Sequence, residues 1–192
     1  MYDASPDPYC YPGTKLLKNL ADIRRQSDLN TFELALTTQR FAEGLPRGRL
    51  SVTHYYAVHW HLFQDVYAWA GKPRSVRIAK GASSFCYPEN IATEMRKLFT
   101  WLKQNDFLRT VEPPTFAKGA AHFLSELNAI HPFRDGNGRT QLAFMAFMAL
   151  LAAEAGQEFN VQKIKGGPFL VVMIASFNGD ERLLVAEIGK LI

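Results

Sequence analysis

The feature that most constrains the fold of this chain is a run of apolar residues at positions 142–153, which follows a polar loop containing two glycines. A helix needs about 20 apolar residues to cross a bilayer, and this run is too short for that. A helix that is apolar on every face must instead be covered by neighbouring elements. We therefore expect a mainly α-helical fold around a central helix that is buried on nearly all sides.

Other segments of the chain also carry helix signals. Ser51 is a good N-cap for a helix that continues through Trp69. Pro88 can begin a helix that runs to about Gln104, because proline suits the first helical turn. Residues 115–130 form a further helix that leads into the polar loop. These helices are available to surround the central one.

The chain has 192 residues, of which 47% are hydrophobic, and this is enough to build one domain with a sizeable core. We expect a single domain over residues 1–192, with its core at about residues 50–192. Residues 1–49 are predicted to form a helical N-terminal extension. Within it, residues 14–23 carry apolar side chains at helical spacing, and a second helix ends near Ala42.

Charge and cysteine content narrow the function classes. The net charge of +4 suits a polyanionic nucleotide, while the absence of a long basic run or a zinc-finger spacing argues against specific nucleic-acid recognition. Cys10 and Cys86 do not make a disulfide framework and suit reduced thiols in a cytosol. Residues 1–13 do not resemble a secretory signal. We expect a cytoplasmic protein that does not enter membranes; delivery into a host cell stays open.

The polar loop, residues 131–140, has the sequence His-Pro-Phe-Arg-Asp-Gly-Asn-Gly-Arg-Thr. Gly136 and Gly138 allow the backbone to approach a ligand closely, and a loop that opens into a helix presents unpaired N–H groups to an anion. Asn137 can donate from its side-chain amide to a phosphate oxygen. Arg139 adds a permanently charged donor with a geometry suited to phosphate. The loop therefore predicts a phosphate-binding site.

The same loop carries a base and a hard metal ligand. His131 can be a neutral base near pH 7, and Asp135 beside a phosphate suits Mg²⁺. Phe133 is apolar among polar neighbours and is predicted to anchor the loop in the core. Taken singly, these residues are typical of turns and solvated surfaces. Their joint arrangement is much rarer and favours a functional site.

Residues 131–139 resemble the signature of the Fic family, His-x-Phe-x-(Asp/Glu)-Gly-Asn-Gly-Arg, at every specified position. Most members of this family transfer AMP from ATP to a hydroxyl group of a target protein. The resemblance implies a Fic-type helical bundle with a small β-hairpin flap over the active site. It also implies that His131 deprotonates the target's Tyr, Thr or Ser hydroxyl and that Asp135 holds Mg²⁺. The phosphates of ATP would then contact Gly136, Asn137, Gly138 and Arg139.

The chain departs from the family pattern at Leu142. A second arginine usually occupies this position, where the family uses it for the distal phosphate of ATP and for pairing with an inhibitory glutamate. The departure leaves two alternatives open. The chain could use another nucleotide or phospho-donor on the same scaffold, or it could be a non-catalytic module that binds a nucleotide.

A second segment, residues 76–85, resembles the family's flap, which registers an extended target segment by strand-like pairing. Val76 and Ile78 alternate with polar or small residues, as in a half-exposed strand. By this resemblance Lys80 and Phe85 flank the target side chain. Without the resemblance, an ordinary surface hairpin would be the favoured interpretation.

Regulation is expected to come from outside the chain. Many Fic proteins carry an inhibitory motif, Ser/Thr-x-x-x-Glu-Gly/Asn, and this sequence has no match; Thr38 and Glu43 are one residue too far apart. The absence resembles the compact bacterial toxin class, whose inhibitory glutamate is supplied by a separate small antitoxin. A bacterial toxin or effector is therefore the expected type.

Three histidines, His54, His59 and His61, invite a comparison with metal ligands. On a helix, His54 and His61 share a face while His59 points elsewhere. No cysteine pair or His-Glu-x-x-His spacing accompanies them. We therefore expect them to be packing or surface residues.

Overall fold

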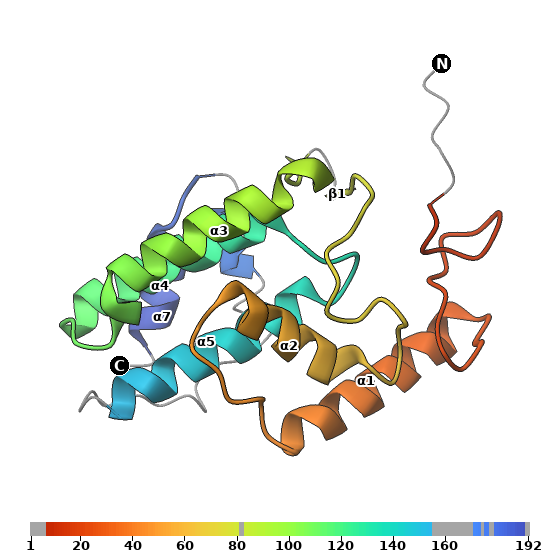
Figure 1. Ribbon diagram of the computed structural model, residues 1–192, viewed down its shortest axis with the longest axis horizontal. Helices are drawn as coiled ribbons and strands as arrows, with labels where there is room; N and C mark the ends of the chain where they lie inside the picture. The colour runs from red at the N-terminus through yellow and green to blue at the C-terminus, as the bar shows by residue number, and fades with distance from the viewer. Residues whose placement is uncertain (1–6, 81–82, 155–170, 174, 177–178, 191–192) are drawn as a thin grey trace.

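The computed structural model describes residues 7–80, 83–154, 171–173, 175–176 and 179–190. These residues form a mainly helical fold (Figure 1). The helices are α1 (Gln26–Ala42), α2 (Val52–Phe63), α3 (Pro88–Gln104), α4 (Pro113–Ile130), α5 (Asn137–Glu154) and α7 (Arg182–Gly189), with a short 3-10 turn, η1 (Asp106–Leu108). Two short strands, β1 (Ala79–Lys80) and β2 (Ser83–Ser84), complete the described elements.

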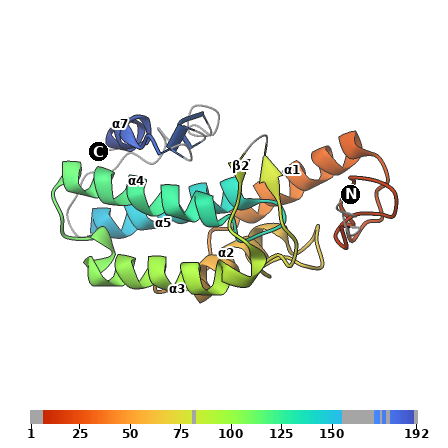
Figure 2. The ribbon, with the colours of Figure 1, turned by 90° about the horizontal axis from the view of Figure 1, so that it is seen from above.

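Helix α5 occupies the centre of the bundle, as the apolar run predicts. It packs against α2 and α4, while α3 and α7 lie on opposite sides of α4 (Figure 2). Buried side chains follow one another around α5 instead of forming a single stripe: Ala143, Phe144, Met145, Met148, Ala149 and Ala152. The expectation of a central, nearly enclosed helix is confirmed.

Helix α3 shows how closely a local pattern can specify an element. Pro88 stands in its first turn, and the helix ends at Gln104, as expected. Ile91, Met95, Leu98 and Leu102 are buried along one face. Their spacing of three or four residues places them on the same side of the helix, which packs on α4.

The helix expected at residues 14–23 is not present, and the N-terminal extension is helical only from α1 onward. The side chain of Asn19 explains the difference, since its amide donates to the carbonyl oxygens of Leu17 and Ile23 and its oxygen accepts from the Ile23 N–H. Such local side-chain bonds compete with helical hydrogen bonds. An isolated bridge between Cys10 and Leu17 holds the segment in an irregular form.

Helix α2 begins as predicted and ends earlier than predicted. The Ser51 side chain accepts a hydrogen bond from the backbone N–H of His54, which confirms the N-cap. The helix stops at Phe63 instead of Trp69. Beyond Phe63, the backbone makes a hydrogen bond to a distant segment: the Leu20 N–H donates to the carbonyl oxygen of Val66.

The two strands pair antiparallel, with Ala79 opposite Ser84 and Lys80 opposite Ser83. The side chain of Lys80 lies outside the described part of the structure. Val76 and Ile78 are half-buried and Arg77 is exposed, so the predicted alternation is present even though the paired strands are only two residues long.

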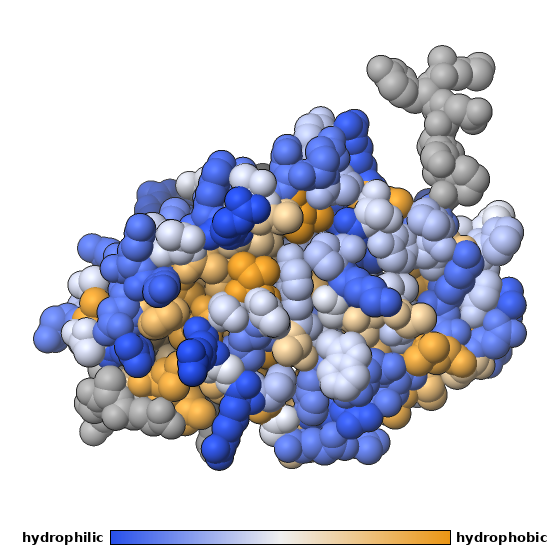
Figure 3. Space-filling model, in the orientation of Figure 1, coloured by the Kyte–Doolittle hydropathy of each residue, from blue (hydrophilic) through white to orange (hydrophobic). Residues whose placement is uncertain are grey.

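The face drawn in Figure 3 is mostly hydrophilic, with small hydrophobic patches between α3 and α5 and along α1. On α1 the exposed side chains include Leu34 and Phe41. Among the described helices, none is both long enough and apolar enough to cross a membrane.

Candidate active site

His131 lies at the point where α4 ends and the polar loop begins. Its backbone adopts the left-handed conformation, with φ of 48°, and its N–H still bonds back to Leu127. The imidazole Nδ1 lies 3.2 Å from the carbonyl oxygen of Asn128, and its ring stacks on Phe85 with ring centroids 3.8 Å apart. A carbonyl can only accept, so Nδ1 carries the hydrogen and Nε2 carries the lone pair in the neutral ring. The ring is therefore held in the tautomer that a general base needs.

Phe133 and Asn137 fix the shape of the loop. Phe133 is fully buried and stacks on His59 with centroids 3.7 Å apart, which agrees with its expected role as the anchor. The Asn137 amide donates to the Phe133 carbonyl oxygen at 2.8 Å, and its oxygen accepts from the Phe133 N–H at 3.0 Å. Both bonds are made to the backbone of the loop itself, so the buried Asn137 side chain closes the loop.

His59 supports the loop from α2. Its Nδ1 accepts a hydrogen bond from the Gly71 N–H at 2.8 Å, so its Nε2–H donates to the Asp135 carbonyl oxygen at 3.0 Å. Burial lowers the pKa of His59 to about 3, which keeps the ring neutral. His54 and His61 bond other carbonyl oxygens, and no metal-binding group of three His, Cys, Asp or Glu side chains occurs among the described residues.

Gly136 lies where the loop passes closest to α2. Its φ is +78°, and a Cβ built on it would come within 2.4 Å of Phe63 Cζ and 3.1 Å of His59 Nε2. Only glycine combines this backbone conformation with such a close approach. The loop therefore rests directly on the aromatic side chains of α2.

We expect Gly136→Ala to lower the free energy of unfolding by about 1–3 kcal/mol, because the new methyl group meets two packed rings and the positive φ is strained. Gly138→Ala is the matched control, since its added Cβ would meet no atom within 4 Å. Urea denaturation of both variants tests this difference. Equal stability of the two variants would contradict the tight packing of the loop.

The N-terminus of α5 presents a group of backbone donors. The N–H groups of Asn137, Gly138 and Arg139 have no hydrogen-bond acceptor within the part of the chain that the structure describes. The Thr140 N–H is the first to bond into the helix, to Gly136. Unpaired N–H groups at the positive end of a helix dipole form an anion site.

Asp135 stands beside these donors. One carboxylate oxygen accepts from the Gly136 N–H at 2.6 Å, and the side chain is 49% exposed. A single accessible carboxylate next to an anion site fits Mg²⁺, which uses one or two carboxylates together with phosphate oxygens and water. It does not fit a metal held by protein ligands alone.

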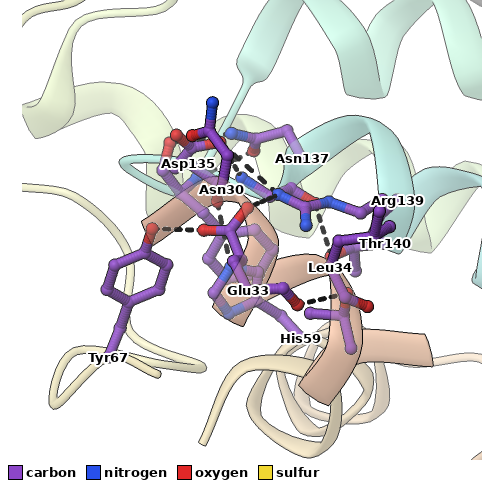
Figure 4. A network of polar contacts seen from close by, with 12 residues as sticks. Asn30, Glu33, Leu34, His59, Tyr67, Asp135, Asn137, Arg139 and Thr140 are labelled. Carbon is purple, nitrogen blue, oxygen red and sulfur yellow. Dashed lines mark hydrogen bonds and ion pairs between the residues drawn. The ribbon is translucent and has the colours of Figure 1, made fainter. Parts of the chain in front are cut away.

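Arg139 is part of a polar network that reaches α1 (Figure 4). Its Nη2 lies 2.5 Å from Glu33 Oε1, and the guanidinium carbon lies 4.6 Å from the ring centre of Phe63. The other carboxylate oxygen of Glu33 accepts a hydrogen bond from the Tyr67 hydroxyl. Sequence analysis missed Glu33 and Tyr67, because no local motif connects α1 with a loop about a hundred residues later.

Arg74 joins the segment around the β1–β2 hairpin to the end of α4, and sequence analysis missed it too. Its buried guanidinium donates to the carbonyl oxygens of Val76 and Cys86, which flank the β1–β2 hairpin, and to those of Ile130 and His131 at the end of α4. Its backbone N–H also donates to Pro132. The carbonyl groups of Ile130 and His131 lie at the end of α4, where the last carbonyl groups of a helix lack intrahelical donors. Arg74 therefore fixes the backbone on both sides of His131.

Comparison with known proteins gives a consistent result. Residues 49–149 match the Fic/DOC family. The probable protein adenylyltransferase y4lH of Sinorhizobium fredii is 50% identical over 192 residues, which are 100% of this chain and 98% of that protein. The protein adenylyltransferase VbhT of Bartonella schoenbuchensis is 35% identical over 98% of this chain, which spans only 40% of that longer protein.

A solved structure shares the fold. It is the N-terminal Fic domain of a VirB-translocated effector protein from Bartonella quintana, determined with bound ADP. The TM-score is 0.83 and the sequence identity is 25%, over 95% of this chain and 93% of that one. The similarity therefore extends beyond the loop to nearly the whole chain.

Proposed function

This chain belongs to the Fic/DOC family, and we propose that it transfers AMP from ATP to a hydroxyl group of a target protein. The observation that carries this proposal is the arrangement around one loop. A base, His131, ends α4, and within the same loop the unpaired N–H groups of α5 and the guanidinium of Arg139 form an anion site. The named adenylyltransferases among its relatives support the same activity.

The residues suit the chemistry of this transfer. Nε2 of His131 takes the proton from the target hydroxyl as its oxygen attacks the α-phosphorus of ATP. The new oxygen–phosphorus bond forms as the bond to pyrophosphate breaks, and pyrophosphate leaves. The N–H groups of Gly138 and Arg139 would hold phosphate oxygens in line for the attack. Asp135 would hold Mg²⁺, which supplies neutralisation of phosphate charge.

The β1–β2 hairpin is proposed to act as the flap over this site. Phe85, directly after β2, stacks on the His131 ring, so a segment paired with the hairpin would lie beside the base. Main-chain pairing with a strand edge accepts an extended peptide with little demand on its sequence. Lys80 would flank the target side chain on the opposite strand.

The partners follow from this activity. The target would present a Tyr, Thr or Ser hydroxyl, and a small antitoxin would supply an inhibitory glutamate. We propose a cytoplasmic toxin or effector.

Because Leu142 replaces the second arginine, we expect this protein to lack a preference for ATP, which has a third phosphate, over ADP. It lies half-buried against the core, one turn after Arg139, and has no donor for a distal phosphate. We expect ADP and ATP to bind with similar affinity. Leu142→Arg should strengthen ATP binding relative to ADP by about tenfold or more, since a charged hydrogen bond contributes roughly 1.5–3 kcal/mol.

Isothermal titration calorimetry with both nucleotides measures this ratio, and Leu142→Met is the matched control without a charge. A wild-type protein that already prefers ATP strongly would show that another group grips the distal phosphate.

Label transfer tests the proposed function and its nearest alternative, a different nucleotide donor. The protein is incubated with Mg²⁺, bacterial lysate and each of the four ribonucleoside triphosphates, labelled at the α-phosphate. We expect discrete labelled protein bands with ATP. Bands with another triphosphate alone would assign a different donor, and binding of ATP without any transfer would support a non-catalytic module.

A further inference from the structure

The guanidinium of Arg139 is bound by Glu33 through Nη2, while its other donors are accessible to a ligand. Within the described residues its Nη2 contacts Glu33 at 2.5 Å and Asp135 at 4.0 Å, and the ring of Phe63 lies beneath its plane. Within the described residues, Nε and Nη1 have no hydrogen-bond acceptor. The side chain is 36% exposed, so these donors remain accessible to a ligand.

Glu33 is itself firmly placed. Its side chain is 13% exposed, and its second oxygen accepts from the hydroxyl of Tyr67, which is buried and stacks on Trp69 with centroids 4.4 Å apart. Glu33 comes from α1, outside the matched residues 49–149. An element beyond the matched segment thus reaches the arginine of the phosphate loop, as Figure 4 shows.

A carboxylate on a phosphate-binding arginine can have two opposite effects. It can occupy the donors and oppose the nucleotide, or it can hold the side chain in the orientation that the nucleotide requires. Here the carboxylate meets one terminal nitrogen and leaves Nε and Nη1 available. A free arginine loses much rotamer freedom when it binds a phosphate, and a side chain that is already fixed loses less. The geometry favours the second effect.

We propose that Glu33, fixed by Tyr67, is a positioning residue that orients Arg139 toward the phosphates of the nucleotide. This inference rests on the proposed function in one respect, namely that the loop binds ATP. Glu33 does not touch the nucleotide. It acts through Arg139. In the family pattern a second arginine, replaced here by Leu142, contacts the phosphates directly. The fixed orientation of Arg139 makes up for part of the binding that this contact would supply.

Three substitutions test this role: Glu33→Gln, Tyr67→Phe and the control Glu43→Gln. Glu43 lies just beyond the end of the same helix and pairs with Arg40, away from the loop. We expect the Kd for ATP to rise about tenfold in Glu33→Gln and about threefold in Tyr67→Phe, since the first weakens a charged hydrogen bond and the second removes one support. Glu43→Gln should leave the Kd unchanged.

Calorimetric titration with ATP gives these constants without any need for turnover, and steady-state transfer adds the KM for ATP and for the target. The positioning role requires the KM for ATP to rise while the KM for the target stays constant. Tighter ATP binding or faster transfer in Glu33→Gln would show that Glu33 restrains Arg139 instead. A similar rise in the KM for ATP and in the KM for the target, together with a lower melting temperature, would show a purely structural role. A wild-type protein that binds ATP and transfers nothing would overturn the proposed function and leave the Kd comparison valid.

Discussion

We expect His131→Ala to lower the rate of AMP transfer by about 10²–10⁴-fold, the usual contribution of a general base, while the Kd for ATP stays nearly constant. In the proposed mechanism the imidazole supplies a proton acceptor at Nε2, while its Nδ1–H is directed to the Asn128 carbonyl oxygen. Loss of the ring therefore affects the chemical step alone. Initial rates with α-labelled ATP and calorimetric Kd values measure the two effects separately.

His122→Ala is the matched control for this substitution. His122 lies on the same helix, α4. Its ring is half-exposed, and its Nδ1 lies 3.7 Å from Glu181 Oε1. Its removal should leave both the rate and the Kd for ATP near their wild-type values. A rate for His131→Ala close to that of His122→Ala would assign the base to another residue.

The second large effect is expected at Arg74. Arg74→Met keeps the apolar stem but leaves the four carbonyl groups that it bonds without a donor, and a buried unsatisfied carbonyl is costly. The free energy of unfolding should fall by about 3–5 kcal/mol, a large part of the stability of a typical domain. Transfer should fall with it, because the segment around the β1–β2 hairpin and the backbone of His131 lose their common support.

Arg74 has no carboxylate partner among the described residues, so its role is geometric and not that of an ion pair. Burial lowers the pKa of Arg74, yet a guanidinium stays charged. Arg74→Lys keeps the charge but cannot span carbonyl groups on both segments, and it should lose most of the same stability. Arg109→Met, at an exposed pair with Asp106, should change stability little. Urea denaturation compares all three, and a wild-type midpoint for Arg74→Lys would refute the geometric role.

The parts of the fold that sequence could predict are those set by short-range patterns. The apolar run at residues 142–153 predicted the central position of α5, and the spacing of Ile91 and Met95 predicted the buried face of α3. The N-cap at Ser51 also followed from a local rule. In each case the deciding interactions lie within a turn or two of the chain.

The predictions that failed depended on distant or side-chain-specific contacts. The expected helix at residues 14–23 gives way to the hydrogen bonds of Asn19, and beyond the end of α2 at Phe63 the carbonyl oxygen of Val66 accepts from the Leu20 N–H of the N-terminal segment. Apolar spacing alone could not reveal either effect. In both places, polar contacts override a helical pattern.

The candidate site shows the same division. The loop from His131 to Arg139 could be recognised from its own residues, and its one aromatic side chain, Phe133, is buried and stacks on His59. The partners that hold the loop come from elsewhere in the chain: Glu33, His59, Tyr67 and Arg74. No spacing in the sequence links them with the loop, since the fold alone brings them together. Asn137 also serves the loop's own backbone, which its residue type could not reveal.

The most direct test of AMP transfer compares two forms of ATP, labelled at the α-phosphate or at the γ-phosphate, with the same protein and lysate. Transfer of AMP places the α-label on the target and releases the γ-label in pyrophosphate. We therefore expect bands that depend on His131 with the first form only. Bands that depend on His131 with the γ-labelled form would mean that the chain transfers a terminal phosphate, and this would contradict the assignment as an adenylyltransferase.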